Sequence, residues 1–163
     1  MKTKKLAEIL ATQLQLLEEL LLNLERETPE LAEINLTALT EINSLKEGVA
    51  VRIDEHTAPL RQTISDVAVS LALPSTAPLG AVAELLGKQG NKEISRLHQD
   101  LNRLTERVRQ VASLNRDVAE RFLLSVNNSL NFLTHMLNQS TVYGASGGYL
   151  RQQSGAFMIN REI

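Results

Sequence analysis

Residues 144–148 read Gly-Ala-Ser-Gly-Gly, which resembles a catalytic motif, the G-x-S-x-G nucleophile elbow. In that elbow a buried strand precedes the serine, a helix follows it, and an acid and a histidine come later in the chain. Here a long helical pattern precedes Ser146, and no histidine or aspartate follows it. The glycines also lack the Gly-Lys-Ser/Thr that completes a phosphate-binding loop. We therefore expect neither an enzyme nor a nucleotide site.

The histidines are the other residues whose chemistry could matter. His56, His98 and His135 lack the spacing of H-E-x-x-H or of any other metal motif, and the chain contains no cysteine. His56 lies on the apolar side of a predicted helix, so we interpret it as a partly buried histidine that bonds to a neighbour. The sequence predicts no metal and no cofactor.

The charges nearly cancel but are unevenly distributed along the chain. The formal net charge of −2 provides no overall field that would attract nucleic acid. Residues 1–47 carry nine acids and five bases, whereas residues 92–121 carry seven bases and five acids. We expect attraction between the first and last helices. Six of the acids are expected to form a solvated surface: Glu18, Glu19, Glu25, Glu27, Glu30 and Glu33.

Nothing in the sequence indicates export of this chain or a membrane span. No apolar run approaches the ~18 residues that a spanning helix needs. Glu8 and Glu18 interrupt any apolar core behind the lysines at the start of the chain. The sequence predicts a cytoplasmic protein that neither inserts into membranes nor binds nucleic acid.

Apolar residues recur at helical spacing in three segments, and aromatic residues make up only 3% of the chain. We expect helices over about residues 3–27, 36–73 and 91–138. Short connections between long amphipathic helices favour antiparallel neighbours. The predicted fold is all-α, an elongated antiparallel three-helix bundle with coiled-coil-like hairpins. It should occupy residues 1–138, with a flexible Gly/aromatic tail over 139–163.

Prolines and glycines mark the expected breaks. Thr28-Pro29 should end the first helix, because proline lacks an N–H and disfavours helix in the residue before it. Pro59 lies where the heptad spacing changes, so a kink or a break is expected there. Residues 74–91 are expected to be a connection, with one or two helical turns near 79–86.

The last predicted helix carries an unbroken stripe at alternating steps of four and three residues. Its members are Leu97, Leu101, Leu104, Val108, Val111, Asn115, Val118, Phe122, Ser125, Ser129, Phe132 and Met136. Asn115 occupies a position where leucine or valine would stabilise more. A buried asparagine there either fixes the register of the helices or takes part in partner binding, and both readings stay open.

The C-terminal end of that helix is predicted to be an interaction site. Antiparallel pairing leaves everything beyond about Ser129 without a neighbouring helix. That stretch contains Phe132, Leu133, Met136 and Leu137, and an uncovered apolar surface of this kind usually binds a partner. The alternatives are that the tail folds back over it or that two helices dimerise through it.

Three sets of residues along the chain form a recognisable combination: a leucine-rich first helix, five residues of the second and last helices, and a terminal Val-Tyr-Gly-Ala-Ser-Gly. These are residues 16–21, then Leu39, Ile42, Lys46 and Arg61 of the second helix with Asn115 of the last, and residues 142–147. With these features in this order, the whole chain resembles the FlgN family of flagellar export chaperones. Pro59 and the residues beyond 147 depart from the family pattern.

The resemblance implies a chaperone that binds the C-terminal segments of the hook–filament junction proteins FlgK and FlgL. It also implies delivery of these clients to FlhA at the export gate of the flagellar type III apparatus. The candidate client-binding residues are Asn115, Phe122, Phe132, Leu133, Met136 and Leu137, and the candidate gate contacts are Tyr143 and Gly144. The alternative is a structural coiled-coil or self-assembling adaptor protein, against which Pro59 and the tail argue.

Overall fold

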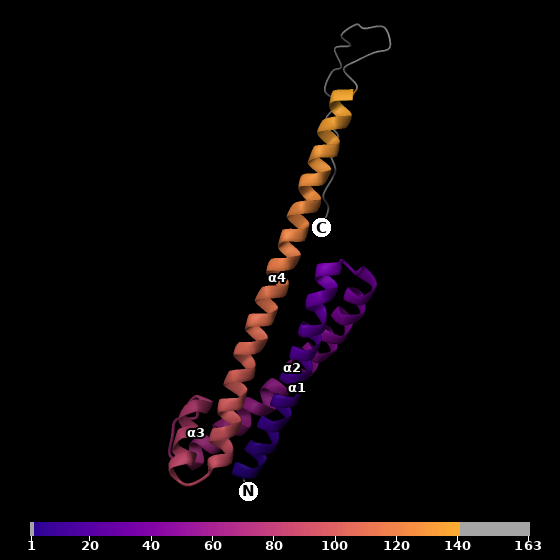
Figure 1. Cartoon of the computed structure of the whole chain (residues 1–163). Coiled ribbons are helices and arrows are strands. Elements are labelled where there is room, and N and C mark those ends of the chain that lie inside the picture. Colours follow the sequence, from indigo (N-terminus) through magenta and orange to yellow (C-terminus); the bar gives the residue numbers. More distant parts are fainter. Residues whose placement is uncertain (1, 141–163) are drawn as a thin grey trace, which may run out of the picture. The chain divides into compact units, whose positions relative to one another are not determined.

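The structure is a computed structural model that describes the backbone of residues 2–140 and the side chains of residues 2–137. Its helices are α1 (Lys2–Glu33), α2 (Leu36–Ser70), α3 (Leu79–Lys88) and α4 (Lys92–Ser140) (Figure 1). Within the described residues there is no strand. The prediction of an all-α bundle is confirmed.

The described residues fall into two units, residues 2–119 and residues 120–140. The boundary between the two units lies inside α4. The expected division into a bundle over residues 1–138 and a tail over residues 139–163 stays a prediction. The expected flexible tail falls almost entirely on residues 141–163, which lie outside the described part of the chain, so it stays a prediction.

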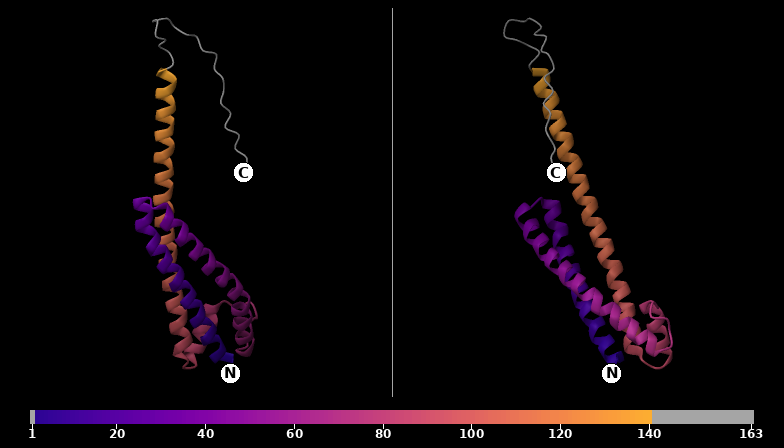
Figure 2. Two further views of the ribbon diagram at one scale, coloured as in Figure 1. Left: turned by 90° about the vertical axis from the view of Figure 1, so that its right-hand side faces the viewer. Right: turned by 180° about the vertical axis from the view of Figure 1, so that it is seen from behind.

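In the first unit α1 and α2 form an antiparallel hairpin, and the two helices lie side by side in both views of Figure 2. Polar contacts record the register: Lys2 with Asp66, Gln13 with His56, Glu19 with Arg52, and Glu27 with Lys46. The start of α4 runs in the same direction as α1, because Glu25 pairs with Arg107 at 3.2 Å and Thr28 meets Asn115. The Glu25–Arg107 pair also confirms the expected attraction between the first and last helices.

The first helix does not end at Thr28-Pro29, because α1 continues through Pro29 to Glu33. A proline removes its own N–H from the helix and crowds the carbonyl four residues earlier, but the N–H groups of the residues after it can still bond, so the helix can continue for another turn. The helix ends instead at Ile34, whose φ is 57°, and the N–H of Asn35 donates to the carbonyl of Glu30 at 3.0 Å. This is the bond of a Schellman motif with a non-glycine residue in the left-handed position.

Asn35 then begins the next helix, since its side chain accepts the N–H of Ala38 at 3.2 Å. α2 passes through Pro59 as one continuous helix, so the proline does not break it. It ends at Ser70, three residues before the expected Leu73, in a second Schellman motif: Ala72 has a φ of 58°, and the N–H of Leu73 donates to the carbonyl of Ala68 at 2.9 Å.

The connection between α2 and α4 contains α3, a little longer than the turns expected there, and α3 completes the main core. Gly90, with a φ of 92°, ends the α3 segment and lets the N–H of Asn91 donate to the carbonyl of Leu86 at 2.9 Å. The buried apolar cluster combines the start of α1, the end of α2, α3 and the start of α4. Its members are Leu6, Ala7, Leu10, Val67, Ala68, Val82, Ala83, Leu86, Ile94 and Leu101.

Candidate functional site

Asn115 is the centre of a buried polar network that joins α1, α2 and α4. Its side chain is only 4% exposed. The Nδ2 group donates to the carbonyl of Leu24 at 2.8 Å and to Oε2 of Glu27 at 2.9 Å. The Oδ1 atom accepts the hydroxyl of Thr28 at 2.7 Å. A single asparagine therefore contacts three residues over little more than one turn of α1.

Glu27 extends this network to α2, because its other oxygen, Oε1, accepts from Nζ of Lys46. Glu27 is 8% exposed, so it does not belong to the solvated acidic surface that the sequence suggested. Both of its carboxylate oxygens have partners, as a buried charge requires. Sliding or rotating α4 against α1 would separate Asn115 from Glu27 and leave a buried carboxylate oxygen without a donor.

These contacts favour the register reading of Asn115 over the partner-binding reading. A buried polar group that has all its hydrogen-bond partners in one alignment of the helices, but lacks them in the neighbouring alignments, favours the first alignment. The participation of Asn115 in client binding stays a prediction. Sequence reasoning missed Glu27 and Thr28 as its partners, although Lys46 on the otherwise apolar side of α2 was a signal that an acid would be buried opposite.

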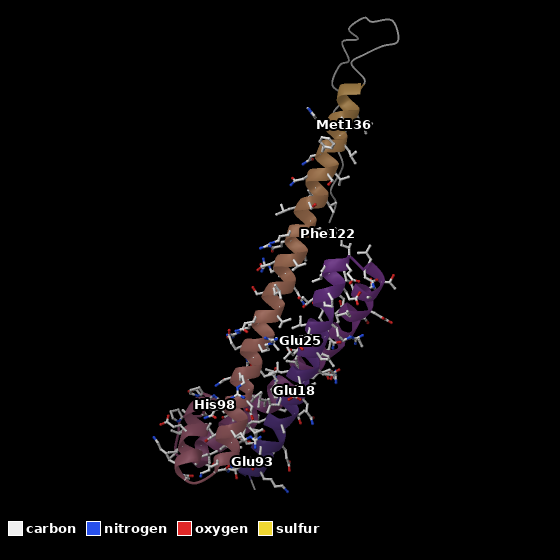
Figure 3. All side chains as sticks on the ribbon, in the orientation of Figure 1. Glu18, Glu25, Glu93, His98, Phe122 and Met136 are labelled. Carbon is white, nitrogen blue, oxygen red and sulfur yellow. The ribbon has the colours of Figure 1, made fainter. Side chains whose placement is uncertain are left out.

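The stripe on α4 changes character near Phe122. Stripe residues from Leu97 to Val118 are buried or half-buried, and Phe122 itself is half-buried. From Leu123 to Leu137 every residue is exposed. Large apolar residues on this stretch are Leu123, Leu124, Val126, Leu130, Phe132, Leu133, Met136 and Leu137, with Phe132 63% exposed. The candidate client residues Phe132, Leu133, Met136 and Leu137 are thus brought together on one exposed stretch of helix, on which Figure 3 labels Met136.

The same stretch carries no formal charge. No lysine, arginine, aspartate or glutamate occurs between Arg121 and Arg151, and the polar residues among the described ones are asparagine, serine, threonine and His135. The candidate gate contacts Tyr143 and Gly144 lie outside the described residues. What the structure offers at this end of the chain is an apolar, uncharged helical surface.

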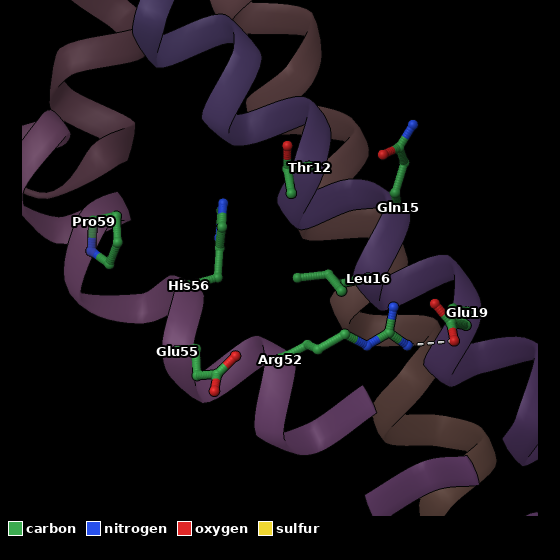
Figure 4. A pocket seen from close by; sticks show the side chains of 8 residues that line it. All are labelled: Thr12, Gln15, Leu16, Glu19, Arg52, Glu55, His56 and Pro59. Carbon is green, nitrogen blue, oxygen red and sulfur yellow. Dashed lines mark hydrogen bonds and ion pairs between the residues drawn. The ribbon is translucent and has the colours of Figure 1, made fainter. Parts of the chain in front are cut away.

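A depression of about 500 Å³ lies between α1 and α2, and Figure 4 shows the side chains that line it. Arg52 and Glu19 form an ion pair across its edge, and this contact raises the pKa of Arg52. His56 is half-buried and meets Oε1 of Gln13 at 3.0 Å, which confirms that it is a histidine bonded to a neighbour. The polar side chains here already pair with one another between α1 and α2. We therefore interpret the depression as a result of how the two helices pack, and not as a binding site.

The described residues contain neither a membrane-spanning helix nor a metal-binding cluster. Within residues 2–140 none of the helices combines the length and apolarity that crossing a bilayer requires. In the same part of the chain no group of three or more histidines and acids is placed to hold a metal ion.

One comparison with known proteins assigns the chain to a family. The model of a protein family described as "FlgN protein" matches residues 1–151. No curated protein and no solved structure matches the chain. The family match covers nearly the whole sequence, including both helices that Asn115 and Glu27 join and the exposed stretch of α4. The chain therefore belongs to the FlgN family, a family of flagellar export chaperones rather than of enzymes.

Proposed function

We propose that this protein acts in the cytoplasm as the export chaperone of hook–filament junction proteins like FlgK and FlgL. It holds their C-terminal segments and delivers them to an export-gate component like FlhA. The observation that carries the proposal is the exposed apolar stretch of α4 in a chain that belongs to a chaperone family. Exposed apolar surface of this extent on a helix suits an amphipathic client helix that lays its own apolar face against it.

The proposal assigns separate tasks to two groups of residues. Phe132, Leu133, Met136 and Leu137 anchor the client, because they are large, apolar and exposed. Tyr143, with Gly144 beside it, contacts the gate, as the family resemblance implies. Phe122 contributes at the edge of the client surface, where it is half-buried.

The test is calorimetric titration of the whole chain against a FlgK C-terminal fragment and against the cytoplasmic domain of FlhA. We expect the double substitution Phe132→Ala with Met136→Ala to weaken client binding by roughly 2 kcal/mol or more, the range of interface hot spots. The fold should survive, because both side chains are exposed. The matched control is Leu22→Ala, an exposed leucine of α1, which should leave client affinity unchanged.

Tyr143→Ala should keep client affinity and impair binding to the FlhA domain. Loss of both interactions in this one variant would contradict the division and would indicate a single extended client site. Unchanged client affinity in the Phe132 and Met136 double variant would remove the exposed stretch of α4 from the client site.

A further inference from the structure

We infer that the client segment held on the exposed stretch of α4 carries an aspartate or glutamate that pairs with Arg121, about three helical turns from its apolar anchor. This pairing rests on the proposed function and specifies the chemistry of the client. The surface concerned is a depression of about 700 Å³ on one side of α4. We call it the serine groove. Arg121 lines one end of it and Phe132 the other, with Ser125, Asn128 and Ser129 between them.

The middle of the serine groove is formed by short side chains, so a second helix can approach α4 closely there. Ser125 and Ser129 occupy two steps of the stripe that continues to Phe132 and Met136. The distance between two packed helices depends on the side chains at their contact, and serine allows a smaller distance than leucine or phenylalanine does. Phe132 and Arg121 are both exposed, so each can contact a side chain of the bound helix. A helical segment that runs along α4 is therefore the shape that suits the groove.

Charge complementarity identifies the group that the client brings to Arg121. Among the described residues that line the groove, Arg121 alone is charged. Three other arginines of α4 pair with an acid, namely Arg96, Arg103 and Arg107. No carboxylate of residues 2–137 forms an ion pair with Arg121. A guanidinium binds a carboxylate through two parallel hydrogen bonds and repels a lysine or arginine, so the matching group of the client is an aspartate or glutamate.

The position of Arg121 determines how the client lies along α4. Arg121 and Phe132 are about 16 Å apart along the helix axis, at 1.5 Å per residue. A client helix parallel to this axis therefore needs its acid about 10–12 residues from the side chain that packs on Phe132. Apolar anchors alone allow the client to bind in either direction. A single charge pair at one end favours one direction and one register over the others.

The charge pair selects the client more than it strengthens binding, because Arg121 is exposed. An exposed ion pair contributes little to affinity and is screened by salt. Arg121→Gln should therefore raise the dissociation constant only about threefold at about 0.05 M NaCl. The constant of the original chain should rise about threefold between roughly 0.05 M and 0.5 M NaCl, and Arg121→Gln should remove most of that rise.

The experiment is calorimetric titration of the whole chain against the FlgK C-terminal fragment at about 0.05 M NaCl. Arg121→Glu places a carboxylate against the client's acid and should raise the dissociation constant at least tenfold. Arg109→Glu is the matched control, because Arg109 is also an exposed arginine of α4 and the change in net charge is the same. It lies about 18 Å from Arg121 along the helix, beyond the range of unscreened attraction, and should leave the constant within about twofold. Circular dichroism checks that both variants remain helical.

Charge reversal on the client identifies the acid itself. Each aspartate and glutamate of the fragment is replaced in turn by lysine and titrated against the original chain and against Arg121→Glu. One replacement should weaken binding to the original chain and restore binding to Arg121→Glu to within about threefold of the original pair. The same replacement should not improve binding to Arg109→Glu.

Equal effects of Arg121→Glu and Arg109→Glu would overturn the inference, as would a set of lysine replacements of which none restores binding to Arg121→Glu. Either result leaves the proposed client site standing if the Phe132 and Met136 double variant still binds the fragment weakly. A fragment that does not bind the original chain would overturn the proposed function and the acid pairing together.

Discussion

Replacing Asn115 by alanine tests whether the buried network holds α4 to the hairpin. The substitution deletes one hydrogen bond to a carboxylate, from Nδ2 to Glu27, and two hydrogen bonds to neutral groups, those with Leu24 and Thr28. The first contributes about 2 kcal/mol and each of the others about 1 kcal/mol. Alanine returns about 0.7 kcal/mol through its higher helix propensity. We expect the free energy of unfolding to fall by about 3 kcal/mol.

The assay is urea unfolding of the whole chain, followed by far-ultraviolet circular dichroism. With a slope of about 2 kcal/mol per molar urea, the midpoint of Asn115→Ala should lie about 1.5 M below that of the original chain. Asn127→Ala is the matched control, because Asn127 is an exposed asparagine on the same helix. It gains the same helix propensity and loses no buried contact, so its midpoint should not fall.

A double-mutant cycle with Glu27→Ala isolates the contact between the two side chains. Once Glu27 is absent, Asn115→Ala removes only the bonds to neutral groups, so the two substitutions should be coupled by about 1.5 kcal/mol or more. Strictly additive effects would show that Asn115 and Glu27 act independently. A midpoint for Asn115→Ala equal to that of Asn127→Ala would refute the claim that the network stabilises the bundle.

Three further outcomes are expected in unfolding and titration experiments. Ala72→Gly should raise the free energy of unfolding by about 0.5–1 kcal/mol, because Ala72 is exposed and held at a φ of 58°, a conformation that strains residues with a Cβ. Ala50→Gly, at an exposed position inside α2, should lower it by about 1 kcal/mol. The hydrogen bond from Lys88 lowers the pKa of Glu84, so Lys88→Met should raise that pKa in an NMR titration of the side-chain carboxyl. Because the folded-state pKa is the lower one, this pair stabilises the fold above the unfolded-state pKa of Glu84, and its contribution is lost as the pH falls through the folded-state value.

Much of the fold follows from the periodicity of the sequence. Leucines at steps of three and four predict long helices, because that spacing places them on one face of a helix, where they can be buried together. The end of α1 could not be predicted from Pro29 alone. Leu24 and Glu27 in the preceding turn are buried, and their tertiary contacts stabilise the helix beyond what the local sequence indicates. Helix ends at Ile34 and Ala72 were also unpredictable, since neither residue type favours the left-handed conformation that ends these helices.

The candidate site was predicted in part. The uncovered stretch of α4 could be anticipated because the lengths of the predicted helices differ. The network around Asn115 could not, because a glutamate near a helix end is usually solvated, and no sequence pattern specifies that Glu27 meets both Lys46 and Asn115. Such pairings depend on the relative rotation of three helices, which sequence spacing constrains only loosely.

The uneven placement of the core has a consequence for how the first unit opens. The main apolar cluster lies where the start of α1 meets α3, and it includes the fully buried side chains of Leu6, Val82 and Ile94. At the other end of the hairpin, the polar network supplies much of the contact between α1 and α4. Backbone amides near the apolar cluster should therefore exchange with solvent only on global unfolding. Those of the last turns of α1 should exchange through local opening, which separates the residue 24–33 segment from α4 while the rest of the bundle stays folded.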